Sequence, residues 1–462
     1  MITYQDYEKA RNKTAFLSEA IARHTGGAEY TVARMADAYD RQENITVNRV
    51  ASMASEGGGG MRIASNFFHR LNTQRCAYLL GNGVGFASRQ MQVNPNGVRV
   101  QVDATKERLG QAFDTALFQW GYKALIHGVA FGFWNLNRLQ VFPITQFVPL
   151  WDEFTGVLRA GIRFWRLDAS RPMRAEFYEI DGMTCYQNPP GTVGGLLVPA
   201  GEKRQYIYTE TRTRVGETVE EAWSNYPGLP IVPLWGNSLH QSTLVGLRGA
   251  IDAYDLIQSG FANTLKDCAT IFWIIENNGG MNDADRREFL RKLREDHIAN
   301  VDSSGFTGDT RNALTPYTQE TPYQSTTAYL EMARRQIYED FGALDVHAIA
   351  ASSTNDHIDA AYQPMDEQAD EFEYQVIEAV QGVLRLMGIE DTPIFKRNRI
   401  SNIKEQVEAV MLEAAALDAE TVIDLLPNLT VDQKAAALAR MDREDWERLN
   451  GGGEGGEGGG EE

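Results

Sequence analysis

The feature that most constrains the fold is a long periodic run over residues 358–388. Apolar residues recur there every three or four positions, which is the period of one face of an α-helix. The pattern predicts a single long helix, the longest in the chain. Pro364 lies near its start and is expected to kink it, because proline removes a backbone hydrogen bond. The apolar stripe consists of Ile358, Ala361, Met365, Ala369, Phe372, Val376, Val380, Leu384 and Met387.

Shorter helices are predicted on both sides of a strand-rich centre. Residues 131–235 are rich in aromatic and β-branched residues between turns, which is typical of strands. An apolar strand is expected at 269–276, and turns with short strands at 301–324. The glycines of residues 55–60 predict a loop or hinge, since glycine runs disfavour regular structure. The predicted helices cover residues 1–41, 61–80, 107–130, 243–267 and about 325–344, with two or three more between 402 and 449. The fold class is therefore α+β, mostly helical.

The charge of the chain limits what it can bind. Among its 462 residues, 44 are Lys or Arg and 63 are Asp or Glu, so the formal net charge is −19. A protein that coats nucleic acid would carry a basic face instead. The acidic balance still permits a protein that surrounds DNA without gripping it.

The search for catalytic motifs fails. There is no phosphate-binding P-loop, no H-E-x-x-H, no G-x-S-x-G and no C-x-x-C. The glycines from Gly81 to Gly85 follow a helix, which is the wrong context for a dinucleotide turn. Cys76, Cys185 and Cys268 are scattered, so they predict neither a disulfide framework nor a zinc site. We therefore expect no catalytic residues, no cofactor and no metal.

Two other observations bear on function. No run of about 18 apolar residues occurs, so no membrane span is expected. An enzyme would most readily use His127 or His69 in the mixed α/β region. That interpretation requires a pocket with a perturbed titratable pair, which the sequence does not offer. His127 fits a core histidine, because it lies on an apolar helix face. The mixed-charge helix expected at 283–297 fits either a solvated face or a docking face.

The order of several sequence blocks resembles the portal proteins of long-tailed (siphovirus-type) bacterial viruses. Each block is weak alone, but together they span about residues 44–390 in a specific order. One departure is Gly83, which stands where the family often has proline. The blocks are Asn48-Arg49, Ser65-Asn66-Phe67-Phe68 to Tyr78-Leu79-Leu80-Gly81-Asn82, Lys123 to Ala130, Phe142-Pro143 to Asp152, Gly228 to Pro233 with Asn237, and Ile251 to Asp255 with Ser259 and Asn263.

The resemblance implies the portal fold of wing, stem, clip and crown, assembled as a ring at one capsid vertex. Position along the chain assigns the parts as follows: wing 1–240, first stem helix 241–267, clip 268–323, second stem helix 324–346, tunnel loop 347–357, long wing helix 358–401, crown 402–450, and a disordered Gly/Glu tail 451–462. The tail has too few apolar residues to order itself, and it matches no family feature.

The resemblance also implies function and partners. The ring would have twelve subunits, or thirteen when purified, and viral double-stranded DNA would pass through it without sequence specificity. Implied partners are the terminase large subunit, the head–tail adaptor, and the major capsid and scaffolding proteins. The implied location of the ring is the portal vertex of the virion, and the host cytoplasm during assembly. The tunnel loop would face DNA through Ala350, Ala351, Ser352, Ser353, Thr354, Asn355 and Asp356. The clip would dock partners through Arg286, Arg287, Arg291, Lys292 and Arg294. The alternative is another capsid-associated (minor head) protein.

Overall fold

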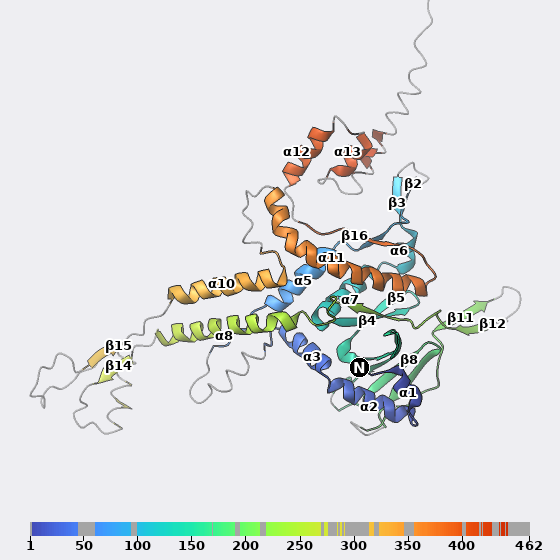
Figure 1. Cartoon of the computed structure of the whole chain (residues 1–462), viewed down its shortest axis with the longest axis horizontal. Coiled ribbons are helices and arrows are strands. Elements are labelled where there is room, and N and C mark those ends of the chain that lie inside the picture. Colours follow the sequence, from blue (N-terminus) through green and yellow to red (C-terminus); the bar gives the residue numbers. More distant parts are fainter. Residues whose placement is uncertain are drawn as a thin grey trace, which may run out of the picture. The chain divides into compact units, whose positions relative to one another are not determined.

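Figure 1 shows the structure of the chain, a computed structural model. The chain divides into two compact units. The structure describes residues 2–44, 61–93, 99–168, 170–189, 195–212, 219–268, 272–275, 314–317, 323–345, 355–399, 403–414 and 419–426, with isolated residues at 284–291 and 417–441. Unit 1 comprises Met1–Glu43, Asn66–Gly249 and Gln336–Glu462. Unit 2 comprises Asn44–Ser65 and Ala250–Arg335.

The N-terminal stretch forms three helices: α1 (Tyr4–Lys9), α2 (Lys13–Thr25) and α3 (Ala28–Asp40). Side-chain caps mark the starts of the first two helices. Thr3 accepts a hydrogen bond from the backbone N–H of Asp6 at 3.2 Å, and Asn12 accepts one from Ala15 at 3.1 Å. Such caps satisfy backbone donors that the first helical turn leaves free.

Helix α5 spans Phe67–Leu80 and ends at Gly81, where the sequence predicts its end. The prediction that this helix begins at Met61 is wrong. Residues 61–66 are not helical, although the spacing of their apolar residues suggests a helix. Distant side chains hold their backbone instead, as described below.

The single helix predicted over residues 107–130 is two helices, α6 (Ala104–Leu109) and α7 (Phe113–His127). Gly110 separates them with φ +85°, and Gly128 ends α7 with φ +89°. Both values lie in the left-handed region, which glycine adopts without steric strain. The apolar periodicity runs across the break because both helices contribute residues to one core.

Two antiparallel sheets make up the predicted strand-rich centre. The three-stranded sheet has the order β13-β4-β5, and the five-stranded sheet has the order β10-β9-β8-β7-β6. A short 3₁₀ helix, Ile144–Gln146, connects β5 to β6. The strands are β4 (Val129–Asn135), β5 (Arg138–Pro143), β6 (Phe147–Trp151), β7 (Leu158–Trp165), β8 (Arg174–Glu179), β9 (Gly182–Gln187), β10 (Val198–Pro199) and β13 (Ile231–Trp235).

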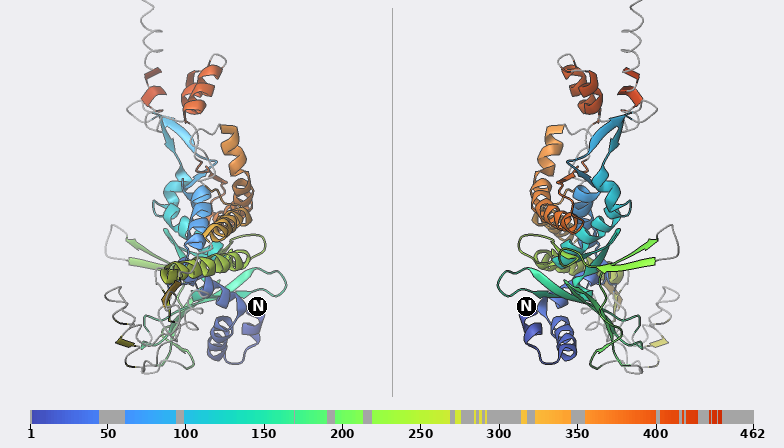
Figure 2. Two further views of the ribbon diagram at one scale, coloured as in Figure 1. Left: turned by 90° about the vertical axis from the view of Figure 1, so that its left-hand side faces the viewer. Right: turned by 90° about the vertical axis from the view of Figure 1, so that its right-hand side faces the viewer.

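Three two-stranded pairings complete unit 1. Strand β1 (Val84–Phe86) pairs with β16 (Pro393–Phe395), which ties the chain's early and late parts together. Strand β2 (Gln90–Val93) pairs with β3 (Arg99–Val102). Strands β11 (Ile207–Arg212) and β12 (Val219–Ser224) form a ribbon that extends away from the rest of unit 1 (Figure 2).

The main core of unit 1 lies between α5, α7, the three-stranded sheet and α11 (Asn355–Leu386). Trp120 of α7 lies flat on β4 and donates from its indole nitrogen to the carbonyl of Ala130 at 3.0 Å. Gly132 makes this possible, since a Cβ there would lie 2.8 Å from the Trp120 ring. Helix α2 packs on the five-stranded sheet through a second core, in which Leu17 and Ile21 contact residues of β6 and β7.

Helix α11 confirms the predicted long helix. Phe372, Val376 and Val380 of the predicted stripe are buried in the core. The helix bends in its N-terminal part (Figure 1), the part that contains Pro364. The helix starts at Asn355, so Asn355 and Asp356 belong to its first turn and not to the loop in which the sequence placed them.

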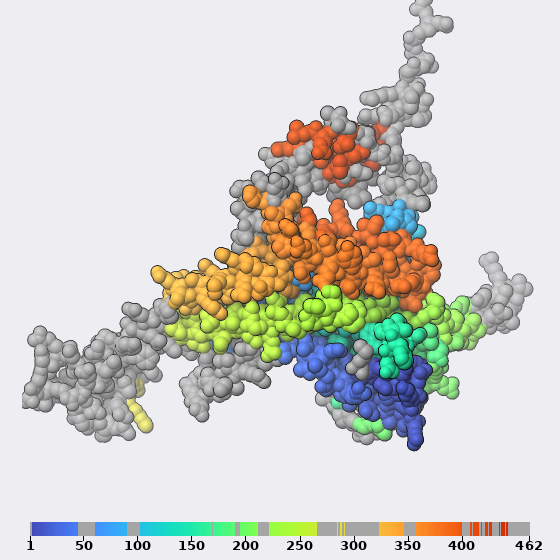
Figure 3. All heavy atoms as spheres, in the orientation of Figure 1, coloured from blue at the N-terminus to red at the C-terminus, as the bar shows by residue number. Residues whose placement is uncertain are grey.

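Unit 2 contains most of α8 (Leu244–Cys268) and the N-terminal part of α10 (Tyr323–Phe341). Within unit 2 these helices run side by side (Figures 1 and 3), and the rings of Phe261 and Tyr323 lie 6.2 Å apart. Strands β14 (Phe272–Ile275) and β15 (Leu314–Tyr317) pair antiparallel. They confirm the strand predicted at 269–276 and one of the short strands predicted at 301–324.

Helices α12 (Ile403–Glu413) and α13 (Ala419–Leu425) confirm the short helices predicted after residue 402. About half of the described residues are helical and fewer are in strands, so the chain is a mixed α and β protein in which helix is the larger part. The strand content is higher than predicted because short ribbons such as β1–β16 and β2–β3 lie between the helices. The tail, residues 451–462, lies outside the described residues.

Candidate functional site

The predicted tunnel loop falls mostly outside the described residues. Residues 346–354 are not described, so the structure does not place Ala350 to Thr354. Asn355 and Asp356 open α11, and His357 is exposed on the first turn of that helix. The small-residue composition of the loop therefore remains a sequence observation.

The predicted clip arginines are described only in part. Arg287 and Arg291 are helical and exposed, and their spacing of four residues places them on one face of the helix. Arg286, Lys292 and Arg294 lie outside the described residues. The helix predicted at 283–297 is thus supported at the four positions 284, 287, 288 and 291.

One of the recognised sequence blocks has a clear structural role in unit 2. Asp255, Ser259 and Asn263 follow each other one helical turn apart on α8 and hold an extended segment, Met61–Ser65, which we call the strap. Asp255 accepts from the N–H of Ser65 at 2.9 Å. Ser259 accepts from the N–H of Ile63 at 3.1 Å, and Asn263 accepts from the N–H of Met61 at 2.6 Å.

The strap is bound much as a strand is bound by its neighbour. Alternate residues donate their backbone N–H to α8, and Asn263 also donates to the carbonyl of Met61 at 3.2 Å. This pattern fits an extended backbone, because alternate N–H groups point to the same side only when the chain is extended. Asp255 is fully buried and accepts a second hydrogen bond from the side chain of Asn44. Burial raises the pKa of Asp255, and these hydrogen bonds oppose the shift.

Two histidine–aspartate pairs lie in unit 1 and bear on the enzyme interpretation. His127 donates from Nε2 to Asp37 at 2.9 Å, and Lys123 binds the same carboxylate at 3.1 Å. Burial would raise the pKa of Asp37, but the contacts with His127 and Lys123 outweigh it and lower that pKa to about 2. Burial lowers the pKa of His127, so its imidazole stays neutral. The expectation of no perturbed pair is therefore wrong for Asp37 and His127.

This pair is not joined to a nucleophile within the described residues. The His127 side chain is fully buried, as expected for a core histidine, and its Nδ1 has no hydrogen-bond partner. The hydroxyl of Ser242 donates to the carbonyl of Ile126 at 2.5 Å instead. His69 and Tyr122 both contact Asp40, which ties α5 and α7 to α3. Both clusters connect elements of the fold, since Asp37 joins α3 to α7 and Asp40 joins α3 to α5 and α7.

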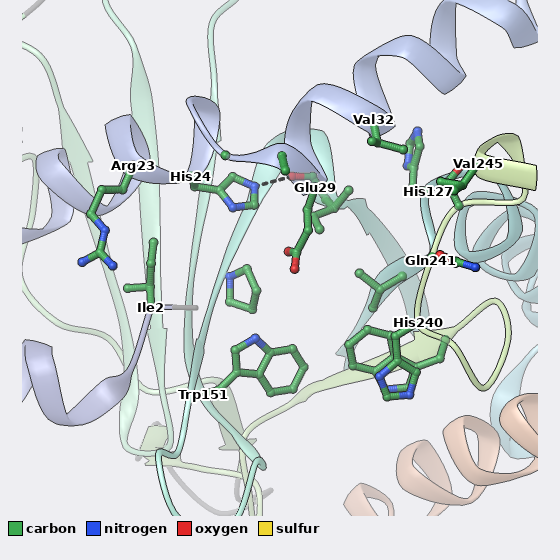
Figure 4. A pocket seen from close by; sticks show the side chains of 17 residues that line it. Ile2, Arg23, His24, Glu29, Val32, His127, Trp151, His240, Gln241 and Val245 are labelled. Atoms are coloured by element: carbon green, nitrogen blue, oxygen red, sulfur yellow. Dashed lines mark hydrogen bonds between the residues drawn. The ribbon is translucent and has the colours of Figure 1, made fainter. Parts of the chain in front are cut away.

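A cavity of about 610 Å³ opens beside His127 in unit 1 (Figure 4). Segments far apart in the sequence form it: the N-terminal helices, β4, β6 and the loop after β13. Sequence analysis did not identify this site, because its walls share no local motif. The nearest signal in the sequence was the block from Gly228 to Pro233 with Asn237, because Trp235 lies between Pro233 and Asn237. Residues from different walls include His24, Glu29, Trp151, Trp235 and His240.

No helix among the described residues is both long enough and apolar enough to span a bilayer. Within the same residues, no three His, Cys, Asp or Glu side chains gather in a way that could hold a metal ion.

Comparison with known proteins gives a family match over most of the chain. The model of the phage portal protein family, SPP1 Gp6-like, matches residues 58–448. The portal protein of Clostridium phage phiCD119 is 34% identical over 116 residues, which is 25% of this chain and 24% of that protein. The chain therefore matches about a quarter of that relative's length.

Solved structures of gene transfer agent particles are also similar. A chain from the virion of the native particle is 11% identical, with a TM-score of 0.39, and the match covers 83% of this chain and 98% of that one. A chain from the neck of the native particle, computed with C12 symmetry, is 13% identical with a TM-score of 0.36, covering 83% and 99%. Because the family model extends over residues 58–448, the chain belongs to the SPP1 Gp6-like family of phage portal proteins.

Proposed function

We propose that the chain assembles into a ring of twelve subunits at one capsid vertex and forms the channel for viral double-stranded DNA. The family match over residues 58–448 carries this proposal. DNA would enter during packaging and leave during ejection. The virion would be the final location of the ring, and the host cytoplasm the place of its assembly.

The charge of the chain supports a passive channel. Duplex DNA carries one negative charge per roughly 1.7 Å of its length. A wall rich in lysine and arginine would retain DNA, whereas an acidic wall repels it weakly. At −19 per chain, twelve copies would carry 12 × −19 = −228. Small residues at the proposed tunnel loop, Ala350 to Thr354, would allow a close fit without adhesion.

The proposed partners bind at different surfaces. The clip, which contains Arg287 and Arg291, would dock the terminase large subunit during packaging and the head–tail adaptor afterwards. The major capsid and scaffolding proteins would surround the ring. A closed ring requires two different faces on each subunit that fit each other. A minor head protein is the second candidate, and no observation in the described residues favours it over the portal.

A charge-reversal experiment tests the docking role of the clip. The double variant Arg287→Glu and Arg291→Glu is expected to form rings but to package no DNA, because the motor loses its charged contacts. The measurement is nuclease-protected DNA in particles made with the capsid, scaffolding and terminase genes of the same virus. Reversal of Arg11 and Arg41, which are exposed on the N-terminal segment of unit 1, is the matched control. Normal packaging by the clip variant would place the docking face elsewhere.

A further inference from the structure

The cavity beside His127 has the size of a ligand site. Its volume of about 610 Å³ falls within the roughly 300–1,000 Å³ that is typical of small-molecule pockets. It is open to solvent on one side, since the lining residues Arg23 and Glu29 are exposed, so a ligand could enter it. No step in the proposed channel function uses it.

Three aromatic rings form one wall of the cavity. The rings of Trp151 and Trp235 stack at 5.7 Å with an interplanar angle of 19°. His240 stacks on Trp235 at 3.8 Å and 14°. His240 has φ +54°, which is strained for a residue with a side chain. The surrounding structure therefore holds this ring in place against a local conformational cost.

The loop that carries His240 is fixed at both ends. A Cβ on Gly236 would lie 2.4 Å from the carbonyl oxygen of Ala124, so only glycine lets the loop approach α7 this closely. Asn237 donates to the carbonyl of Gln241 at 2.8 Å, and Ser242 donates to that of Ile126 at 2.5 Å. The aromatic wall is therefore preformed, which reduces the ordering that a ligand must impose.

The charge that faces the cavity is negative near this wall. In Figure 4 the carboxylate of Glu29 points into the space between His24 and Trp151. His24 donates from Nε2 to the carbonyl of Ile144 at 2.8 Å, and burial lowers its pKa, so it adds no positive charge at neutral pH. Arg23 also lines the cavity, but it lies beyond Ile2 in Figure 4, away from the aromatic wall.

We propose that this cavity binds an organic cation, namely a guanidinium or primary ammonium group on an aliphatic stem. The cation lies against the indole faces, where the ring quadrupole attracts positive charge, and pairs with Glu29. The stem packs on the apolar side chains of Ile2, Val129 and Ile144, which line the same space. The ligand is either a free amine or guanidine, or an arginine or lysine side chain of a protein segment.

The experiment titrates the full-length protein with three probes and follows binding by calorimetry and tryptophan fluorescence, since Trp151 and Trp235 line the cavity. Agmatine represents the free cation, N-acetyl-arginine amide the protein side chain, and N-acetyl-citrulline amide its neutral isostere. We expect saturable binding of at least one cation with a Kd at or below about 1 mM, and binding at least tenfold weaker for the citrulline probe.

Variants link the signal to the cavity. Glu29→Gln is expected to weaken cation binding at least tenfold, and because Glu29 is exposed the variant should fold normally. Glu19→Gln, an exposed carboxylate on α2 outside the cavity, is the matched control and should bind as the wild type does. Tight binding of agmatine alone identifies a free cation as the ligand, and equal or tighter binding of the blocked arginine identifies a protein side chain.

Three results would overturn the proposal. The first is the absence of saturable binding by either cation up to about 10 mM. The second is equal affinity for the arginine and citrulline probes, which would remove the role of charge. The third is unchanged affinity in Glu29→Gln.

Discussion

The two units of the chain are stabilised by different means. Unit 1 buries continuous apolar cores, in which α7 and α11 pack on a sheet and rings such as Trp120 and Phe372 are almost completely buried. Unit 2 holds its strap through three polar side chains of α8 that bind backbone groups. Apolar burial is non-directional and tolerates repacking, whereas the strap depends on the exact register of Asp255, Ser259 and Asn263. We expect substitutions to cost global stability in unit 1 and local order in unit 2.

The largest effect is expected for Phe372→Ala in unit 1. Phe372 is 1% exposed and packs against Gly121 of α7, so its removal leaves a cavity between α11 and α7. The expected loss in the free energy of unfolding is about 3–5 kcal/mol. Urea unfolding followed by circular dichroism measures it.

Tyr374→Ala is the matched control for that experiment. Tyr374 lies on the same helix and is 71% exposed, so its substitution should change stability by less than about 0.5 kcal/mol. Equal losses for both variants would contradict an apolar core between α7 and α11.

The second effect tests the strap. Asp255→Ala leaves the N–H of Ser65 without its acceptor and removes one of the two acceptors of the Asn44 amide, which costs about 1–3 kcal/mol locally. We expect faster hydrogen exchange at the amides of Met61, Ile63 and Ser65, with little change in the core of unit 1. Thr264→Ala is the control, because among the described residues that hydroxyl bonds to its own helix, at the carbonyl of Gly260. Unchanged protection of the three amides would show that something else holds the strap.

The third effect is a pH dependence within the apolar unit. The contacts of Asp37 with His127 and Lys123 lower its pKa to about 2, below the unfolded value of about 3.9. A carboxyl with a lowered folded pKa stabilises the protein above its unfolded pKa and loses this contribution as the pH falls through the folded pKa. Asp37→Asn should therefore lose about 1–2 kcal/mol at neutral pH, and the difference from wild type should shrink between about pH 4 and pH 2. Urea unfolding across that range tests this, and a constant difference would contradict it.

The smallest effect is expected at the Gly/Glu tail. Deletion of residues 451–462 should change neither the thermal midpoint nor ring formation, because its composition provides no side chains for a packed contact. Thermal unfolding and electron microscopy of the truncated chain check both points. Loss of rings would assign the tail a role in assembly.

Sequence patterns predicted the elements whose own residues determine them. The stripe from Ile358 to Leu384 lies on α11 and most of its residues are buried, while Met387 lies in the turn just after the helix. Gly81 ended α5 as expected. The strap was misread as helix, because the hydrogen bonds that extend it come from α8, about 200 positions away in the chain. Periodicity carries no information about such distant partners.

The candidate sites were less predictable than the fold. The resemblance identified Asp255, Ser259 and Asn263 as a block, but their role required the position of residues 61–65. The cavity brings together Glu29, Trp151 and His240 from three segments with no shared motif. The tunnel loop was predicted from position alone, and the start of α11 at Asn355 shows that such positions shift by a few residues.

Negative-stain electron microscopy of the purified chain, with two-dimensional averaging, shows whether the subunits close into a ring. We expect closed rings with a central hole, of twelve or thirteen subunits; for twelve, the mass is 12 × 51.6 ≈ 620 kDa. Chains that stay monomeric at high concentration and also with the scaffolding protein present would contradict the proposed ring.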